Sequence, residues 1–247
     1  MANDIIMPMS PKVKKTNFKG TPQYSISILK YLKKKYKNIA CVVVPNIKID
    51  VNLKHTDVSL RWIQTSDKEG EFSIPKNYWN YFKECINNDK RFIIFPFGFN
   101  CTYNLGHANY IIYDKKYKSM ERFEPYGKTK RKCTNPKNID YKIEKLFNDN
   151  LSKGKNKFIV KYYKPLDFLS KESFQRIQEN EKDMGENDPP GGYCVIWSCW
   201  YAELRLNNYN KNRKYLVDSA LKNILEKNGS LTDYIRNYSE DIVKKLN

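Results

Sequence analysis

The sequence predicts one α+β domain in which a small, mainly antiparallel sheet is flanked by helices. Residues 91–127 contain three short apolar or alternating runs, FIIFPFGFN, HANYIIYD and SMERFEPYG, separated by turn-prone residues. This pattern is typical of three consecutive strands, and the short turns between them predict antiparallel pairing. Residues 194–206 are apolar on nearly every face, which predicts a buried helix. With 40% hydrophobic and 14% aromatic residues the chain can bury one core, and nothing in it marks a second domain.

Ahead of these strands the sequence predicts an arm and a surface helix. Residues 1–20 are polar and basic, which indicates a flexible arm, and a single domain is expected over residues 21–247. Thr21 and Pro22 suit the N-cap and the first position of a helix. Apolar residues follow at helical spacing among lysines, namely Ile28, Leu29, Leu32 and Tyr36.

The other elements are expected to pack around the central strands. Residues 40–44 form a short apolar run that ends at Pro45, which predicts a buried strand. Three stretches carry apolar side chains at helical spacing and predict amphipathic helices: residues 78–86, 138–147 and 212–226. Residues 127–138 are expected to form a basic loop within the domain.

Three residues in this arrangement carry a recognisable chemistry. His107 begins one strand of the predicted hairpin and Glu124 ends its partner, so both lie at the same end of the hairpin. Cys194 follows a Pro-Pro-Gly-Gly loop and opens the buried helix, whose positive end favours a thiolate. A cysteine nucleophile needs a neighbouring imidazole, and the imidazole needs a third group that fixes its tautomer. The sequence therefore predicts a catalytic triad of His107, Glu124 and Cys194.

Each of these residues also has a purely structural interpretation. A single histidine beside a strand is more often structural than catalytic, Glu124 alone suits an exposed strand end, and a free cysteine usually behaves as a small buried apolar residue. Asp114 is the less suitable acid because it falls in the turn at the far end of the hairpin. Cys199, five residues after Cys194, lies inside the predicted helix and is expected to be inert.

The His, acid, Cys order, the FEPYG text around Glu124 and the 17-residue step from His107 to Glu124 resemble the adenovirus maturation protease family. More broadly, roughly residues 92–206 resemble the SUMO-protease superfamily of cysteine proteases, a clan that includes maturation proteases of large DNA viruses. The resemblance implies a papain-like core permuted so that His precedes Cys. It also implies His107 as general base, Glu124 as orienting acid and Cys194 as the nucleophile that attacks a peptide or isopeptide carbonyl.

The oxyanion donor is where the sequence departs from that family. The family usually places a glutamine a few residues before the cysteine, and residues 187–193 contain none. Gln175 and Gln178 lie farther upstream, and Asn187 lies within the stretch, so three side chains are candidates. Val195 also stands where the family has a glycine after the cysteine.

The net charge of +18 is a second indication of function. Basic clusters at residues 30–37, 128–132 and 153–164 would attract polyanions, which makes nonspecific contact with DNA a prediction. The lysine-, asparagine-, isoleucine- and tyrosine-rich composition of an AT-rich genome gives the same charge without any binding, and no nucleic-acid-reading motif is present.

Compartment and cofactors follow from what the sequence lacks. It contains no run of eighteen apolar residues and no signal-peptide core near its start, so no membrane association is expected. Its six cysteines, at positions 41, 85, 101, 133, 194 and 199, show no CxxC spacing. We therefore expect neither a zinc site nor a disulfide framework, no metal and no cofactor. A reducing compartment suits a thiol enzyme, and the resemblance implies the virion or the host cytoplasm.

The resemblance implies a viral cysteine endopeptidase that matures structural proteins, cutting protein substrates at Gly-rich sites. Three alternatives stay open. The same machinery could remove ubiquitin- or SUMO-like modifiers from lysine, or the scaffold could serve a catalytically weak nucleic-acid-binding protein, which the missing glutamine favours. An acetyltransferase with the same His, Glu, Cys order is the third, and transfer of an acetyl group from coenzyme A would distinguish it.

Overall fold

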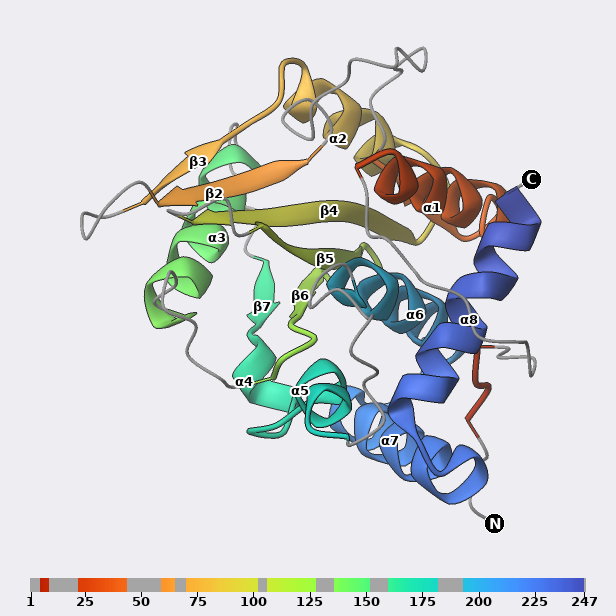
Figure 1. The fold of residues 1–247 in the computed structure, drawn as a ribbon. Helices are drawn as coiled ribbons and strands as arrows, with labels where there is room; N and C mark the ends of the chain where they lie inside the picture. The colour runs from red at the N-terminus through yellow and green to blue at the C-terminus, as the bar shows by residue number, and fades with distance from the viewer. Residues whose placement is uncertain are drawn as a thin grey trace.

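The computed structural model describes residues 5–8, 22–43, 59–64, 70–101, 106–127, 136–151, 160–181 and 193–246. In this part of the chain a mixed sheet lies between two groups of helices (Figure 1), which confirms the predicted α+β class. The strands are β1 (Ala40–Val42), β2 (Leu60–Gln64), β3 (Glu71–Ser73), β4 (Phe92–Cys101), β5 (Gly106–Asp114), β6 (Ser119–Phe123) and β7 (Lys161–Tyr163). The helices are α1 (Pro22–Lys35), α2 (Tyr78–Asn87), α3 (Pro136–Leu151), α4 (Pro165–Phe168), α5 (Phe174–Glu179), α6 (Tyr193–Asn207), α7 (Arg213–Asn228) and α8 (Leu231–Leu246).

The centre of the sheet is the antiparallel meander that the sequence predicts. The strand order is β3-β2-β4-β5-β6-β7, and β4, β5 and β6 pair antiparallel in sequence order. Phe99 pairs with His107, and Tyr110 pairs with Phe123. The strands β1 and β2 pair with β4 in parallel, and β7 pairs with β6 in parallel. The meander thus places the start of β5 and the end of β6 at one end of the sheet.

Strand β4 is long because two strands share one of its edges. Strand β1 pairs with residues 92–94 of β4, and β2 pairs with residues 97–101. Pro96 lies between these two segments and opposite Tyr110 of β5. A proline has no N–H to donate to a sheet, so a break in the pairing on one edge is a favourable position for it.

Each face of the sheet is covered by helices, which explains why the strands are so apolar. Phe92 and Ile94 belong to a core cluster with residues of α1, α6, α7 and α8. Ile93 and Phe95, which point the opposite way, belong to a second cluster with residues of α2 and α3. A sheet that is buried on both faces needs continuous apolar runs instead of an alternating pattern.

Helix α6 is the central helix of the first cluster. Every residue from Tyr193 to Leu206 is buried, as the sequence predicts for this segment. The helix packs against β5, and α1 and α8 also contact it (Figure 1). Because α6 is fixed on all sides, the position of its first turn is fixed relative to β5.

Most helices were predicted and some were missed. The expected helices at residues 78–86, 138–147 and 212–226 correspond to α2, α3 and α7, and α1 begins at the predicted Pro22. Helices α4, α5 and α8 and strands β2, β3 and β7 were not predicted. Residues 5–8 of the predicted arm lie against the body, where Ile6 and Asn208 exchange two hydrogen bonds of 2.7 and 2.8 Å. The rest of the arm lies outside the described residues.

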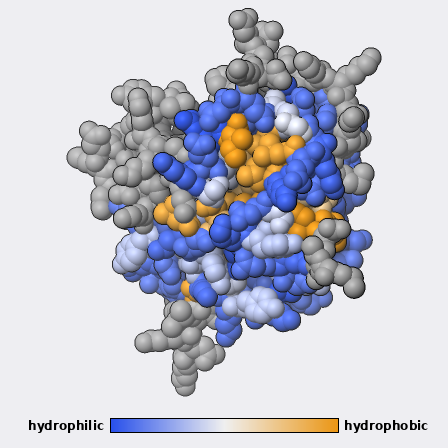
Figure 2. Space-filling model, turned by 90° about the horizontal axis from the view of Figure 1, so that it is seen from below, coloured by the Kyte–Doolittle hydropathy of each residue, from blue (hydrophilic) through white to orange (hydrophobic). Residues whose placement is uncertain are grey.

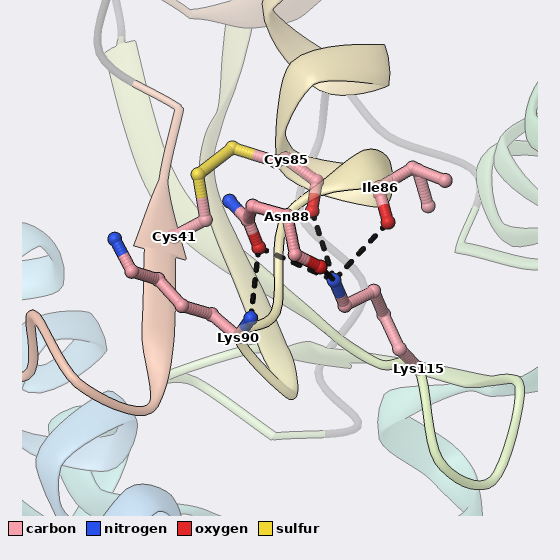
Figure 3. The surroundings of a disulfide bond; sticks show 6 residues. All are labelled: Cys41, Cys85, Ile86, Asn88, Lys90 and Lys115. Carbon is pink, nitrogen blue, oxygen red and sulfur yellow. Dashed lines mark hydrogen bonds between the residues drawn. A yellow bond between two sulfur atoms is a disulfide. The ribbon is translucent and has the colours of Figure 1, made fainter.

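The expectation that the cysteines form no disulfide is wrong for one pair. Cys41 of β1 and Cys85 of α2 are bonded (Figure 3). They lie 44 residues apart in two separate elements, so only the packing of α2 beside β1 brings them together. Lys115 holds the same end of α2, because its ammonium donates hydrogen bonds to the carbonyls of Cys85, Ile86 and Asn88.

The face in Figure 2 is mostly hydrophilic, with hydrophobic side chains across its upper middle and a separate group near its right edge. Among the described residues, no helix has both the length and the apolar character that a membrane crossing requires.

Candidate active site

His107 and Glu124 meet at the end of the central hairpin. His107 is the second residue of β5, and Glu124 is the first residue after β6. The Nε2 atom of His107 lies 2.6 Å from the Oε1 atom of Glu124. Both side chains are largely buried, with 4% and 12% of their surface exposed, so the contact is shielded from water. The structure therefore brings together the predicted base and its predicted orienting acid.

Cys194 reaches the same place from the opposite side of β5. It lies in the first turn of α6, and the backbone N–H of Ala108 donates to its Sγ over 3.4 Å. One turn later, the Ser198 hydroxyl donates to the Ala108 carbonyl over 3.4 Å. The thiol of Cys194 interacts with the ring of His107 and contributes to raising the pKa of that histidine. Because Glu124 engages Nε2, Nδ1 is the ring nitrogen left for the thiol.

Electrostatics favour a charged histidine in this site. Burial alone would lower the pKa of His107, but the Glu124 carboxylate and the bond to Cys194 outweigh it and raise this pKa to about 9. Burial likewise works to raise the pKa of Glu124, and the charge and hydrogen bond of His107 together with Arg122 and the Tyr126 N–H lower it to about 2. At neutral pH the site therefore holds an imidazolium and a carboxylate.

The FEPYG segment forms a turn that aims Glu124 at His107. The N–H of Gly127 donates to the Glu124 carbonyl over 2.9 Å, which closes a β-turn with Pro125 at its second position. The N–H of Tyr126 donates to Oε1 of Glu124 over 3.1 Å. Gly127 has a φ of +79°, and a Cβ there would lie 2.7 Å from the Ser170 carbonyl oxygen, so only glycine fits.

Aromatic rings enclose the imidazole. The ring of Phe99 stacks on His107 with centroids 5.8 Å apart, and the ring of Tyr126 meets it edge-on at 5.4 Å. These rings limit the orientations that the imidazole can adopt.

Four polar residues behind the triad were missed by the sequence analysis. Asn109 and Arg122 lie two residues after His107 and two residues before Glu124. The structure adds Asp140 of α3, which contacts Arg122, and Tyr162 of β7, which donates to Asp140. The available signal was the period of two along a strand, which puts Asn109 on the face of His107 and Arg122 on the face of Glu124.

The three candidate oxyanion donors differ in whether the structure describes them and in whether their amide nitrogen already donates a hydrogen bond. Asn187 lies outside the described residues. Gln175 is buried, and its amide nitrogen is already used, since it donates to the Tyr126 hydroxyl over 2.9 Å and to Glu179 over 3.3 Å. Gln178 is also buried, and its oxygen accepts from the indole N–H of Trp197 over 2.8 Å. Its amide nitrogen has no hydrogen-bond partner among the described residues.

Two further predictions concern metals and the second cysteine. Among the residues that the structure describes, no three His, Cys, Asp or Glu side chains are grouped so that they could hold a metal ion. Cys199 is fully buried, its Sγ lies 3.3 Å from the Tyr238 hydroxyl, and burial raises its pKa well above the ordinary value. These surroundings fit an unreactive thiol.

The trio thus combines a thiol, a base and an oriented carboxylate, the set of groups needed for nucleophilic catalysis by cysteine.

No family model matches the sequence. A protein of Acanthamoeba polyphaga mimivirus that is named as an ankyrin repeat protein, L371, is 28% identical to the chain. The match covers 92% of this chain and 32% of that protein, so the chain spans about a third of the length of this relative.

Three solved structures are similar to this structure at low identity. ChlaDub1 from Chlamydia trachomatis is 11% identical, with 96% of this chain and 95% of that chain covered and a TM-score of 0.49. The SUMO protease Ulp1 with its catalytic cysteine oxidised to a sulfinic acid is 12% identical, with 92% and 78% covered and a TM-score of 0.44. The Chlamydia trachomatis effector Cdu1 bound to ubiquitin is 14% identical, with 94% and 81% covered and a TM-score of 0.40. All three TM-scores are below 0.5.

Proposed function

We propose that the protein is a cysteine protease that uses Cys194, His107 and Glu124. The observation that carries the proposal is the contact of 2.6 Å between His107 and Glu124 beside a cysteine in the first turn of a buried helix. A structural histidine does not require a buried carboxylate on one ring nitrogen and a thiol on the other. A catalytic histidine requires both, because one partner fixes the tautomer and the other receives or gives the proton.

The proposed reaction is attack of the Cys194 sulfur on a peptide or isopeptide carbonyl. The carbon–sulfur bond forms as the carbonyl becomes a tetrahedral oxyanion. His107, held as an imidazolium, gives its proton to the leaving amine as the carbon–nitrogen bond breaks. Water then attacks the thioester while neutral His107 takes its proton. The carbon–sulfur bond breaks, the carboxylic acid leaves, and the thiolate of Cys194 beside the imidazolium of His107 is regenerated. Glu124 keeps the imidazole oriented and stabilises its positive charge in each step.

We assign the oxyanion side chain to Gln178. Of the two candidates in the described residues, only Gln178 keeps an amide N–H that is not already donated. Its oxygen is held by Trp197, three residues after Cys194 on the same helix, so the amide is fixed relative to the nucleophile. Backbone N–H groups in the first turn of α6 have no partner within the helix and supply the second donor.

Two classes of substrate are candidates for this site. The names of Ulp1 and of Cdu1 bound to ubiquitin set the first class to test, an ubiquitin-like modifier joined to lysine. Maturation of viral structural precursors at Gly-rich sites is the second class. The relation to a mimivirus protein supports a viral source, with action in the virion or the host cytoplasm. Contact with DNA remains a prediction from the charge of +18.

The test is a reaction with ubiquitin and SUMO vinyl sulfones, followed by mass spectrometry that identifies the modified cysteine. We expect one adduct, on Cys194, and cleavage of a matching isopeptide-linked substrate. Cys194→Ala should form none, and Cys199→Ala should react like the parent.

The outcomes separate the substrate classes. Reaction with neither modifier, together with cleavage of a Gly-Gly-containing precursor peptide, would assign the protein to maturation instead of deconjugation. If Cys194→Ala retained both the reaction with modifiers and the cleavage of the precursor peptide, the protease proposal would be overturned. If no cleavage occurs while DNA binds, the alternative of a nucleic-acid-binding protein on this scaffold becomes the better account.

A further inference from the structure

We infer that Arg122 is a positioning residue for Glu124, and that Asp140 allows it to serve in this way by occupying the other side of its guanidinium group. The inference rests on the proposed protease function. It assigns a role to four buried residues that lie outside the triad, namely Arg122, Asp140, Asn109 and Tyr162.

One side of the guanidinium is fully engaged by Asp140. Both Nε and Nη2 of Arg122 lie 2.9 Å from Oδ1 of Asp140. The Tyr162 hydroxyl donates to the same oxygen over 2.8 Å. Asp140 comes from α3 and Tyr162 from β7, so the guanidinium is fixed from two separate elements. Asp140 is also the nearer of the two carboxylates that compensate the buried charge of Arg122.

The other side of the guanidinium faces the triad. Nη1 of Arg122 donates to Oδ1 of Asn109 over 2.6 Å and approaches Oε2 of Glu124 at 3.4 Å. Oε1 of Glu124 is the oxygen that holds His107 at 2.6 Å. Glu124 therefore has one oxygen for the imidazole and one for the arginine, and the carboxylate cannot rotate without losing both contacts.

Asp140 and Glu124 contact different nitrogens of Arg122, which explains why this buried arginine does not draw Glu124 away from His107. A guanidinium beside a single carboxylate tends to form a two-pronged pair with it. If Arg122 paired with Glu124 in that way, Glu124 would be drawn away from His107. Asp140 instead occupies the Nε and Nη2 edge through one oxygen, Oδ1, and Glu124 meets the single nitrogen Nη1 at the longer distance.

Asn109 completes the link between the arginine and the ring. Its oxygen accepts from Arg122, and its amide nitrogen donates to the Ala108 carbonyl over 2.8 Å and lies 3.1 Å from Nε2 of His107. Ala108 is the residue whose N–H contacts the Cys194 sulfur. A displacement of Arg122 would thus reach both the ring and the backbone beside the nucleophile.

The charged groups around Glu124 determine the pH signature of this arrangement. His107 and Arg122 face its two oxygens, and the Tyr126 N–H is its backbone donor. Cys194 lies beyond His107, and Asp140 lies beyond Arg122. Glu179 of α5 accepts a hydrogen bond from the Tyr126 hydroxyl, so the ring of Tyr126 separates Glu179 from Glu124. Because Arg122 helps to hold the pKa of Glu124 low, its loss should raise that pKa and move the acid limb of activity to higher pH.

The test compares two variants by the rate of Cys194 alkylation with iodoacetamide across pH and by kcat and KM on the best substrate. The first is the double variant Arg122→Gln with Asp140→Asn, which leaves no buried carboxylate without its partner. The second is Arg122→Lys, which keeps the charge for Asp140 but cannot engage both sides. We expect kcat to fall about tenfold or more with KM within about twofold, and the acid limb of alkylation to shift upward. If the double variant does not fold, Arg122→Lys carries the test.

The matched control is Arg205→Gln. Arg205 is equally buried, and its ion pair with Glu121 of β6 is 3.0 Å long but lies away from the triad, and Glu121 retains Arg213. This variant should lower thermal stability without moving the acid limb. The inference is overturned if a folded Arg122 variant keeps the parent's kcat and pH profile, or if Arg205→Gln shifts the acid limb equally. A parent protein in which Cys194 reacts no faster than Cys199 would refute the proposed function itself.

Discussion

The backbone N–H of Ala108 donates to the Sγ atom of Cys194 over 3.4 Å, so the residue that follows the base in sequence contacts the nucleophile directly. This contact links the start of β5 to the first turn of α6, two segments 86 residues apart. It fixes the thiol beside His107 through the main chain, so among substitutions at position 108 only proline would remove the donor. The relative placement of nucleophile and base is therefore a property of how β5 packs on α6.

Alkylation should distinguish the two free cysteines. We expect iodoacetamide to modify Cys194 below about pH 7, well under the ordinary thiol pKa, because His107 can hold the thiolate as an ion pair. Cys199 should stay unmodified in the folded protein, since it is fully buried. Mass spectrometry of the digested protein measures both sites.

Alanine variants of the triad residues and of Cys199 test the same prediction through the turnover of substrate. Cys194→Ala and His107→Ala should each abolish turnover while the domain stays folded, and Cys199→Ala should keep most of it. Full activity in Cys194→Ala, or equal alkylation of both cysteines, is the result that contradicts an assembled triad.

The ion pair of His107 and Glu124 should make stability depend on pH. The pKa of His107 rises from 6.5 to about 9, so its contribution is complete below pH 6.5 and is lost as the pH rises through 9. The pKa of Glu124 falls from 4.5 to about 2, so its contribution is complete above pH 4.5 and is lost as the pH falls through 2. The two together give the largest stabilisation between about pH 4.5 and 6.5.

Thermal melts that compare Glu124→Gln with the parent at several pH values measure this pH-dependent stabilisation. The difference in Tm should be largest near pH 5.5 and should shrink as the pH rises toward 10. Asp149→Asn is the control, because Asp149 and Lys145 form an exposed pair that contributes little to stability. A difference in Tm that is the same at pH 5.5 and pH 10 would show that the pair is not ionised as described.

The central hairpin and helix α6 could be predicted because their sequence signals are local. Short turns separate the apolar runs of β4, β5 and β6, and α6 is apolar throughout, so each element is defined within its own segment. The hairpin then puts His107 and Glu124 at one end without further information. Helix α8 had a similar signal that was overlooked: Ser230 accepts the Asp233 N–H as an N-cap would, and Leu231, Tyr234, Ile235, Tyr238 and Ile242 are buried at helical spacing.

The network behind the triad could not be predicted in full because its members come from four elements. In SMERF all five residues are buried, so alternation does not show which charged residue faces which helix layer. Glu121 pairs with Arg205 of α6, and Arg122 pairs with Asp140 of α3, on opposite faces of the sheet. Only the packing of both helix layers determines those partners. The pairing of Cys41 with Cys85 depends on packing in the same way.

The oxyanion assignment predicts different effects for the two glutamines. Gln178→Ala should lower kcat by about 10²–10³ and leave the alkylation rate of Cys194 unchanged, because alkylation forms no oxyanion. Gln175→Ala should cause a smaller loss, since its amide is committed to Tyr126 and Glu179. Trp197→Phe removes the donor that holds the Gln178 oxygen and should lower kcat by an intermediate amount.

Steady-state kinetics on one substrate, with alkylation measured in parallel, decides between these candidates. If Gln175→Ala shows the large loss in kcat and Gln178→Ala does not, the assignment is reversed. If neither variant loses activity, the donor lies in the segment around Asn187, outside the described residues.

The disulfide predicts a loss of stability that is separate from catalysis. Cys41 and Cys85 close a loop of 44 residues, and loop-closure entropy for that length corresponds to about 4 kcal/mol of unfolding free energy. Cys41→Ala with Cys85→Ala should therefore lower the denaturant midpoint markedly. The bond joins β1 to α2, whereas Cys194 lies on the helix layer that covers the other face of the sheet, so the rate of Cys194 alkylation should stay within about twofold of the parent.

Reduction of the parent protein should reproduce the double variant, because both remove the same covalent link. Urea unfolding with and without dithiothreitol measures the first effect, and alkylation of Cys194 measures the second. The double variant itself should be insensitive to dithiothreitol. If reduction leaves the midpoint of the parent unchanged, Cys41 and Cys85 are not bonded in solution. If it instead abolishes Cys194 reactivity at a denaturant concentration where the protein is folded, α2 and the triad are coupled through the sheet, contrary to the separation of the two core clusters.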